Sequence, residues 1–360
     1  MRSMDNSSHS RTSSPLIRHW IMLCAVLVLL MVIIGGLTRL TESGLSIVEW
    51  KLVTGIFPPV TEAGWEAELQ EYRSSPQYQQ INKGMSIAEF KSIYWLEYLH
   101  RLLGRVVGIA FIIPLIFFAA TKRITRCNLF RMIAITALVG LQGFIGWYMV
   151  SSGLNNVPSV SPYRLALHLG GATVIFGLLV KMWYRLGSYV ARDYVSKLPL
   201  IILGVIFLQI SLGALVAGLD AGLTYNTFPL MDGDIVPSGL FLLEPLHLNF
   251  FENVTMVQFQ HRSFAYVVVA LVTFQHIRLL RHSTNRAAIR ASWQLTGLTY
   301  LQAIVGIATL LYVVPISLAS IHQTIAILLI GLCVRLHHLL HWRTEEDSSS
   351  YSHKEHHVCA

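Results

Sequence analysis

Charged residues are scarce in this chain of 360 amino acids: they make up 13% of it, whereas hydrophobic residues make up 54%. A soluble globular domain has about 25% charged residues, so the soluble classes are excluded. Apolar runs take their place, several of them long enough to cross a bilayer as an α-helix of about 20 residues. The net charge of +8 is therefore not a sign of nucleic-acid binding, and it is expected in loops on one side of a membrane.

Cysteine is also rare, with four residues at Cys24, Cys127, Cys333 and Cys359. None of them forms a C-x-x-C pair, so a zinc or dithiol motif has no support. Two lie within apolar runs and two near Lys- and Arg-rich segments, so we expect no disulfide on the opposite side of the membrane. The first apolar run is not followed by a small-residue cleavage site, which favours a retained helix over a cleaved signal peptide.

The apolar runs predict an all-α polytopic membrane protein with eight transmembrane helices, at residues 20–38, 93–120, 132–150, 164–186, 199–219, 257–280, 292–312 and 318–340. Basic residues dominate three connections, Lys122–Arg131, Arg185–Lys197 and Arg278–Arg290, and accompany both ends of the chain. The stretch 220–255 has five acids and neither Lys nor Arg. The positive-inside rule then puts the N-terminal segment 1–19 and the polar tail 343–360 in the cytoplasm, or in the matrix of a mitochondrion.

The first loop on the opposite, outer side is long, covering residues 41–92, and it is rich in aromatic residues. We expect short helices near Glu62–Tyr72 and Ser86–Lys91. A loop of this length is more often a functional cover than a plain connection, and the alternative is a disordered spacer.

The chain repeats itself. G-G-L-T-R-L-T-E-S-G-L-S from Gly35 matches G-A-L-V-A-G-L-D-A-G-L-T from Gly213, and L-Q-G-F-I-G from Leu141 matches L-Q-A-I-V-G from Leu301. A third pair joins the segments that begin at Trp95 and Met256. We therefore expect two tandem four-helix bundles of the same orientation, in residues 20–190 and 199–342.

Four of the fifteen histidines lie near the outer ends of the even-numbered spans: His100, His168, His261 and His322. A lone histidine in a membrane helix is more often a packing residue, but two at matching positions in each half indicate metal or cofactor ligands. A structural zinc site usually needs four ligands close together. One heme per half, held by two histidines, fits better. Small residues one turn away leave room for a porphyrin, although they also allow close helix packing.

Charged residues accompany these histidines. Glu97 lies one turn before His100, and at the matching position of the second half the residue is Gln258. A carboxylate beside a heme in a low-dielectric site can move protons. The alternative is a salt bridge from Glu97 to Arg101, four residues on. Arg101 and Arg262 are candidates to pair with heme propionates, as is Arg105, which has no counterpart; snorkelling to the interface is the alternative.

At this point the chain resembles the heme A synthase family over about residues 16–342. The matching motifs are the Gly35 segment, E-Y-L-H-R-L-L-G-R from Glu97, L-H-L-G-G-A from Leu167, F-Q-H-R from Phe259 and I-H-Q from Ile321. The cysteine-free first loop is similar to the proteobacterial and mitochondrial branch. The thiol-linked electron route of members with a cysteine pair there therefore does not apply.

The resemblance implies oxidation of the C8 methyl group of heme O to a formyl group by successive hydroxylations, which gives heme A for terminal oxidases. It implies a substrate heme at His100 and His168 in the N-terminal half, with Glu97 as the catalytic carboxylate. It further implies a bound heme b at His261 and His322 in the C-terminal half.

Two other functions stay open at this stage. A di-heme cytochrome b for electron transfer is disfavoured because all four histidines lie near one face of the membrane. A transporter would explain the tandem halves, but no central polar or broken helix is evident. The sequence does not identify the electron donor, the oligomeric state, or a contact with heme O synthase.

Overall fold

Eight long helices form the molecule in the computed structural model, which describes residues 15–50, 54–155, 157–187, 189–191 and 196–344. Their bounds are α1 Pro15–Leu40, α4 Ile87–Ala120, α5 Arg126–Gly153, α6 Pro162–Arg185, α7 Leu198–Gly218, α9 Val254–His282, α10 Arg286–Leu311 and α11 Ile316–His341. Each is long and apolar enough to cross a membrane, so the prediction of eight spans is confirmed. Most of the helices extend several residues beyond the predicted ends.

Capping side chains explain part of this extension. The hydroxyl of Ser86 accepts a hydrogen bond from the backbone N–H of Glu89, while the Glu89 carboxylate accepts one from the Ser86 N–H at 2.8 Å. This capping box starts α4 at Ile87, before its apolar run. The separate short helix predicted at Ser86–Lys91 is therefore wrong, because these residues form the cap and first turn of a transmembrane helix.

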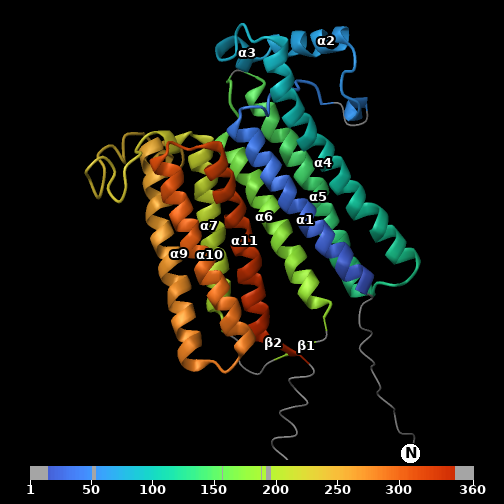
Figure 1. Ribbon diagram of the computed structural model, residues 1–360, viewed down its shortest axis with the longest axis vertical. Coiled ribbons are helices and arrows are strands. Elements are labelled where there is room, and N and C mark those ends of the chain that lie inside the picture. Colours follow the sequence, from blue (N-terminus) through green and yellow to red (C-terminus); the bar gives the residue numbers. More distant parts are fainter. Residues whose placement is uncertain (1–14, 51–53, 156, 188, 192–195, 345–360) are drawn as a thin grey trace, which may run out of the picture.

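The helices of each half are neighbours in a ring. In the first half α1 packs on α4 and α6, and α5 packs on α4 and α6. In the second half α7 packs on α9 and α11, and α10 packs on the same two helices (Figure 1). Contacts of α6 with α7 and α11, and of α1 with α11, join the halves. The tandem bundles of common orientation stay a prediction, which these neighbours support.

Small residues and polar ties hold the halves together. A Cβ at Gly331 of α11 would come within 3.2 Å of the Phe176 ring on α6, so the two helices approach closely there. At the outer end Arg39 of α1 forms a salt bridge of 2.8 Å with Asp220, just after α7. Deeper in the bundle, the Gln323 side chain on α11 donates to the backbone carbonyl of Val32 on α1 at 2.6 Å.

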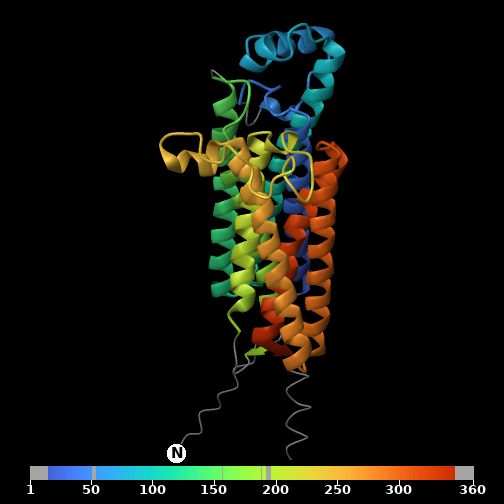
Figure 2. The same cartoon turned by 90° about the vertical axis from the view of Figure 1, so that its left-hand side faces the viewer.

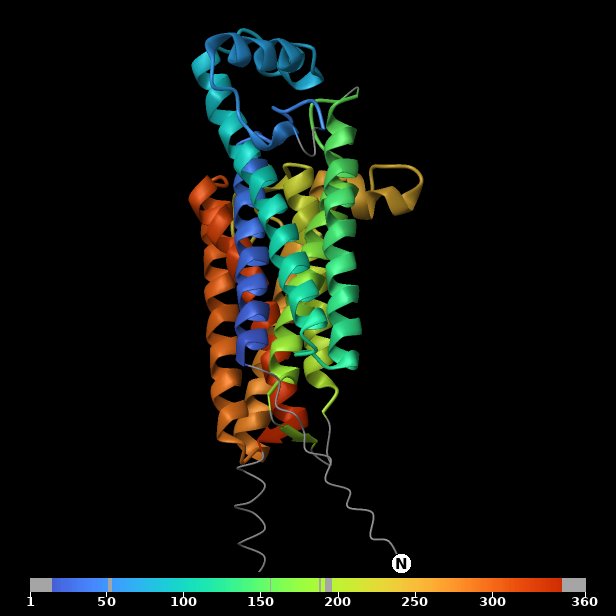
Figure 3. The same cartoon turned by 90° about the vertical axis from the view of Figure 1, so that its right-hand side faces the viewer.

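The long first loop folds over the end of α4. It contains the 3-10 turn η1 (Thr54–Ile56) and the helices α2 (Glu62–Arg73) and α3 (Pro76–Gln80), which project beyond the other helices (Figures 1 and 3). The predicted helix at Glu62–Tyr72 is thus present as α2. The loop has a small core of its own, made by Trp65, Leu69, Tyr72, Phe90, Tyr94 and Tyr98. Burial raises the pKa of Tyr72, whose hydroxyl donates to Gln77 at 3.0 Å.

The connection from α7 to α9 lies across the same end of the molecule (Figure 2) and contains η2 (Ala221–Leu223), η3 (Leu246–Leu248) and α8 (Asn249–Glu252). At the opposite end α1 begins and α11 ends. There β1 (Tyr189–Ala191) pairs with β2 (Trp342–Thr344) as two short antiparallel strands. Residues 1–14 and 345–360, which make up most of the predicted N-terminal segment and tail and include Cys359, lie outside the described residues.

Candidate functional site

Each of the four candidate histidines lies against a glycine of the preceding transmembrane helix. A Cβ atom at Gly35, Gly146 or Gly213 would lie 2.9 to 3.0 Å from the Cε1 atom of His100, His168 or His261 respectively. At Gly306 it would lie 2.6 Å from Cε1 of His322. Such distances are shorter than an ordinary carbon–carbon contact of about 3.5 Å, so only glycine leaves room for these rings. The same device occurs four times, twice in each half.

Glutamine side chains contact three of the four histidines. The amide nitrogen of Gln142 lies 3.0 Å from Nδ1 of His168, and that of Gln209 lies 3.1 Å from Nδ1 of His261. Gln302 reaches Nε2 of His322 at 3.3 Å. The sequence analysis did not identify these residues as part of the site. The signal was present, because each glutamine stands four residues before the glycine in its own helix.

The histidines approach one another in pairs. The rings of His261 and His322 have their centroids 6.4 Å apart, and His168 is close enough to His100 to affect it electrostatically. Two imidazoles bound to one iron from opposite sides, with metal–nitrogen bonds of about 2 Å, have ring centroids roughly 6 Å apart. The C-terminal pair thus has the spacing that bis-histidine ligation of a heme requires. The part of the chain that the structure describes contains no group of three His, Cys, Asp or Glu residues that would form a zinc site.

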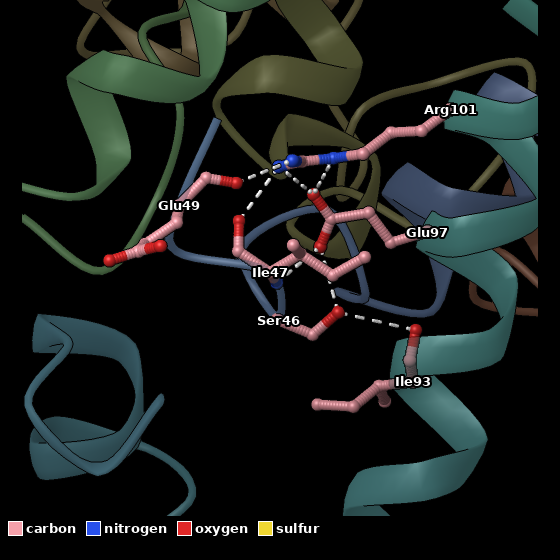
Figure 4. Close-up of polar contacts among 6 residues, drawn as sticks. All are labelled: Ser46, Ile47, Glu49, Ile93, Glu97 and Arg101. Atoms are coloured by element: carbon pink, nitrogen blue, oxygen red, sulfur yellow. Dashed lines mark hydrogen bonds and ion pairs between the residues drawn. The ribbon is translucent and has the colours of Figure 1, made fainter. Parts of the chain in front are cut away.

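Glu97 is buried, with 2% of its surface exposed, and both carboxylate oxygens have partners (Figure 4). One oxygen accepts hydrogen bonds from the Ser46 hydroxyl at 2.7 Å and from the backbone N–H of Ile47 at 2.8 Å. The other accepts two from the Arg101 guanidinium, at 2.7 and 3.1 Å. The salt bridge considered as the alternative reading of Glu97 is therefore formed. A carboxylate with four donors is held in one position, since it cannot turn without losing several of them.

Arg101 joins Glu97 to the chain that follows α1. Its guanidinium also donates to the backbone carbonyls of Ile47 at 2.7 Å and Glu49 at 3.0 Å, and it lies 5.0 Å from the ring of Trp50 (Figure 4). The two motifs that start at Gly35 and Glu97 thus meet at one point. The role predicted for Arg101 as a propionate partner is not tested by this geometry, and its hydrogen bonds show a second role, in positioning Glu97.

The second half repeats this arrangement without the carboxylate. Gln258 is as buried as Glu97 and donates to the carbonyl of Tyr225 at 3.3 Å. In the repeat Tyr225 matches Ile47, the residue whose N–H binds Glu97. Arg262 donates to the carbonyls of Pro229 and Leu230 at 2.9 and 3.1 Å, much as Arg101 holds the 47–49 backbone. The two halves therefore differ in charge at one equivalent position.

A cavity of about 300 Å³ lies at the outer side of Glu97, below the loop. Arg101 and Arg105 line it together with Tyr94 and Tyr98 of α4, and with Gly55 and Phe57 of the loop. The two guanidinium groups give it positive charge, which the carboxylates of Glu49 and Glu68 partly offset. Arg105, predicted as an anion-binding residue, thus lies beside Arg101, whereas Arg262 belongs to the other half.

Comparison with known proteins agrees with this geometry. The model of the cytochrome oxidase assembly protein family matches residues 18–334, which include all four histidines and Glu97. The chain belongs to the heme A synthase family. It is 49% identical to the heme A synthase of Parvibaculum lavamentivorans over 320 residues, or 88% of this chain and 91% of that one. The heme A synthases of Sinorhizobium medicae and Nitrosomonas eutropha are 47% and 44% identical, over 91% and 86% of this chain and 89% of each relative.

Proposed function

We propose that this chain oxidises the C8 methyl group of heme O to a formyl group and so produces heme A. The observation that carries the proposal is the single buried carboxylate, Glu97, one helical turn from His100, in a molecule whose second half has Gln258 at the equivalent position. The family membership supports the same reaction. Successive hydroxylations of the methyl group give an alcohol and then a geminal diol, which loses water to form the aldehyde.

His100 and His168 are the proposed residues that hold the substrate heme. The glycines behind both rings, Gly35 and Gly146, support this role because they let the imidazoles lie close to the neighbouring helices. Arg101 and Arg105 at the outer cavity have the charge to bind propionates. The farnesyl tail of heme O is apolar, so entry from the bilayer is favoured.

His261 and His322 are the proposed ligands of a resident heme b. The centroid distance of 6.4 Å between their rings fits two axial ligands on one iron. When bound, such a heme supplies reversible one-electron transfer. Gln209 and Gln302 orient the two rings, and the buried Gln258 leaves this half without a nearby carboxylate to move protons.

Glu97 is the proposed catalytic carboxylate. Reduction of oxygen to water consumes protons, and a carboxylate one turn from the substrate ligand is placed to deliver them. Ser46 and Arg101 hold the carboxylate in position, and their hydroxyl and guanidinium groups also connect it with the outer cavity. This route keeps the proton donor at one side of the substrate, away from the lipid.

The protein is a multi-pass membrane protein, and we further propose the inner membrane with both ends of the chain in the cytoplasm. The start of α1 and the end of α11 lie at the same end of the molecule, opposite the long loop, which supports this orientation (Figure 1). A reduced electron donor is required. Contacts with heme O synthase and self-association stay predictions.

The test is the pigment content of cells that express the chain together with a source of heme O. We expect an acid–acetone extract to contain heme A in addition to heme O and heme b. Unchanged heme bound to the protein would support the cytochrome b alternative instead. A protein without heme would support the transporter alternative and contradict the proposal.

A further inference from the structure

His100 differs from the other three histidines in its surroundings. No hydrogen bond to its ring is present among the described residues, and its buried Nδ1 atom has no partner. At the other three sites a glutamine amide contacts the ring, and Gln142 and Gln209 also donate to the backbone carbonyl of their histidine. The ring of His100 is thus held by packing alone.

Met31 stands where the fourth glutamine would be. It lies four residues before Gly35, as Gln142, Gln209 and Gln302 lie four residues before Gly146, Gly213 and Gly306. Its methyl carbon is 3.8 Å from the position of a Cβ atom on Gly104, one turn beyond His100. Gln142 contacts the corresponding position at Gly171, one turn beyond His168. Met31 therefore fills the space of the amide, but its thioether is only a weak hydrogen-bond acceptor.

The consequence follows from how protein ligands hold metals. A hydrogen bond to the second ring nitrogen fixes the ring orientation and tautomer, and its loss typically weakens metal binding by about tenfold or more. In the C-terminal half both histidines have such a partner, whereas in the N-terminal half only His168 does. A resident cofactor benefits from two fixed ligands, while a substrate that must arrive and leave as product requires one that yields.

We propose that Met31 makes His100 the displaceable ligand of the N-terminal pair, so that this half exchanges its heme while the C-terminal half retains its own. Met31 is a positioning residue in this account, acting through His100. The inference rests on the proposed function, because it assumes a substrate heme at His100 and His168.

The experiment measures heme release from the purified full-length protein in detergent, under anaerobic conditions that prevent turnover. Apomyoglobin is added as the heme acceptor, and chromatography identifies the heme that has transferred. We expect heme O to leave the wild-type protein faster than heme b. Met31→Gln should slow the release of heme O about tenfold and leave that of heme b unchanged.

Two further variants control for size and for the principle itself. Met31→Leu keeps the bulk without adding an amide, so both rates should stay at the wild-type values. Gln209→Met puts a thioether beside His261 and should speed the release of heme b about tenfold. Thermal unfolding of each variant separates altered ligation from loss of the fold.

The outcomes distinguish the two proposals. Release of heme O from Met31→Gln at the wild-type rate, in a protein that still makes heme A, would overturn this inference alone. A change of rate in Met31→Leu equal to that in Met31→Gln would also overturn it, since the effect would then not depend on the amide. If heme b co-purifies but heme O binds to none of the variants, the substrate site fails, and this inference fails with it.

Discussion

Replacing Gly306 by alanine should separate heme binding from helix stability. A Cβ atom at this position would lie 2.6 Å from Cε1 of His322, whereas an ordinary contact is about 3.5 Å. The ring must then move by about 1 Å, because the atom in its way belongs to a helix backbone. Metal–ligand bonds tolerate changes of about 0.2 Å, so we expect His322 to bind iron at least tenfold more weakly.

The same substitution should make the helix itself more stable. Alanine is favoured over glycine in a helix interior by about 1 kcal/mol. The matched control is Gly297→Ala on the same helix, where a Cβ atom would meet nothing within 4 Å. The control should gain the same helix stability and keep its heme.

The assay measures the heme b content and absorption spectrum of the purified variants, together with thermal unfolding of the heme-free proteins. Gly306→Ala should lose the spectrum of a six-coordinate heme, while Gly297→Ala should match the wild type. A Gly306→Ala protein with full heme content and an unchanged spectrum would refute the role of these glycines in making room for the histidines.

Three further predictions concern the carboxylate, the loop and the orientation. Arg101→Ala leaves the Glu97 carboxylate buried without its charged partner, so it should lower stability by about 3 to 5 kcal/mol, more than Arg262→Ala, whose printed partners are backbone carbonyls; equal losses of stability in the two variants would contradict this. Trp65→Ala should expose the 54–86 loop to protease by removing about 3 to 5 kcal/mol of packing, whereas Phe57→Ala, with the ring 83% exposed, should not; equal cleavage of both would argue against a folded loop. In a Cys359→Ser background a membrane-impermeant maleimide should label the exposed Cys127 only from the cytoplasmic side, because Cys24 and Cys333 are buried; labelling from outside would reverse the proposed orientation.

The sequence was sufficient to predict the spans and the candidate ligands, because both depend on strong local signals. Eight apolar runs and four histidines at repeated depths need no knowledge of side-chain packing. The helix ends were less predictable, since α4 starts at a polar capping box that lies before its apolar run. The 3.6-residue period of an apolar run contains no information about such caps.

The contacts between distant segments could not be predicted in this way. That Ser46 and the backbone of Ile47 bind Glu97 follows from the folded position of the chain after α1, about 50 residues away. The interaction of each glutamine with a histidine of the next span likewise depends on the rotation of neighbouring helices. Once this geometry is known, the Q-x-x-x-G spacing and its exception at Met31 can be recognised in the sequence.

The most direct test of the central claim is the rate of heme A formation by the Glu97→Gln protein. Glutamine keeps the shape of the side chain and, as Gln258 shows, fits the equivalent position of the second half. The account predicts that the variant binds heme O and heme b at wild-type levels and forms almost no heme A. Formation of heme A at the wild-type rate, with normal heme content, would contradict it.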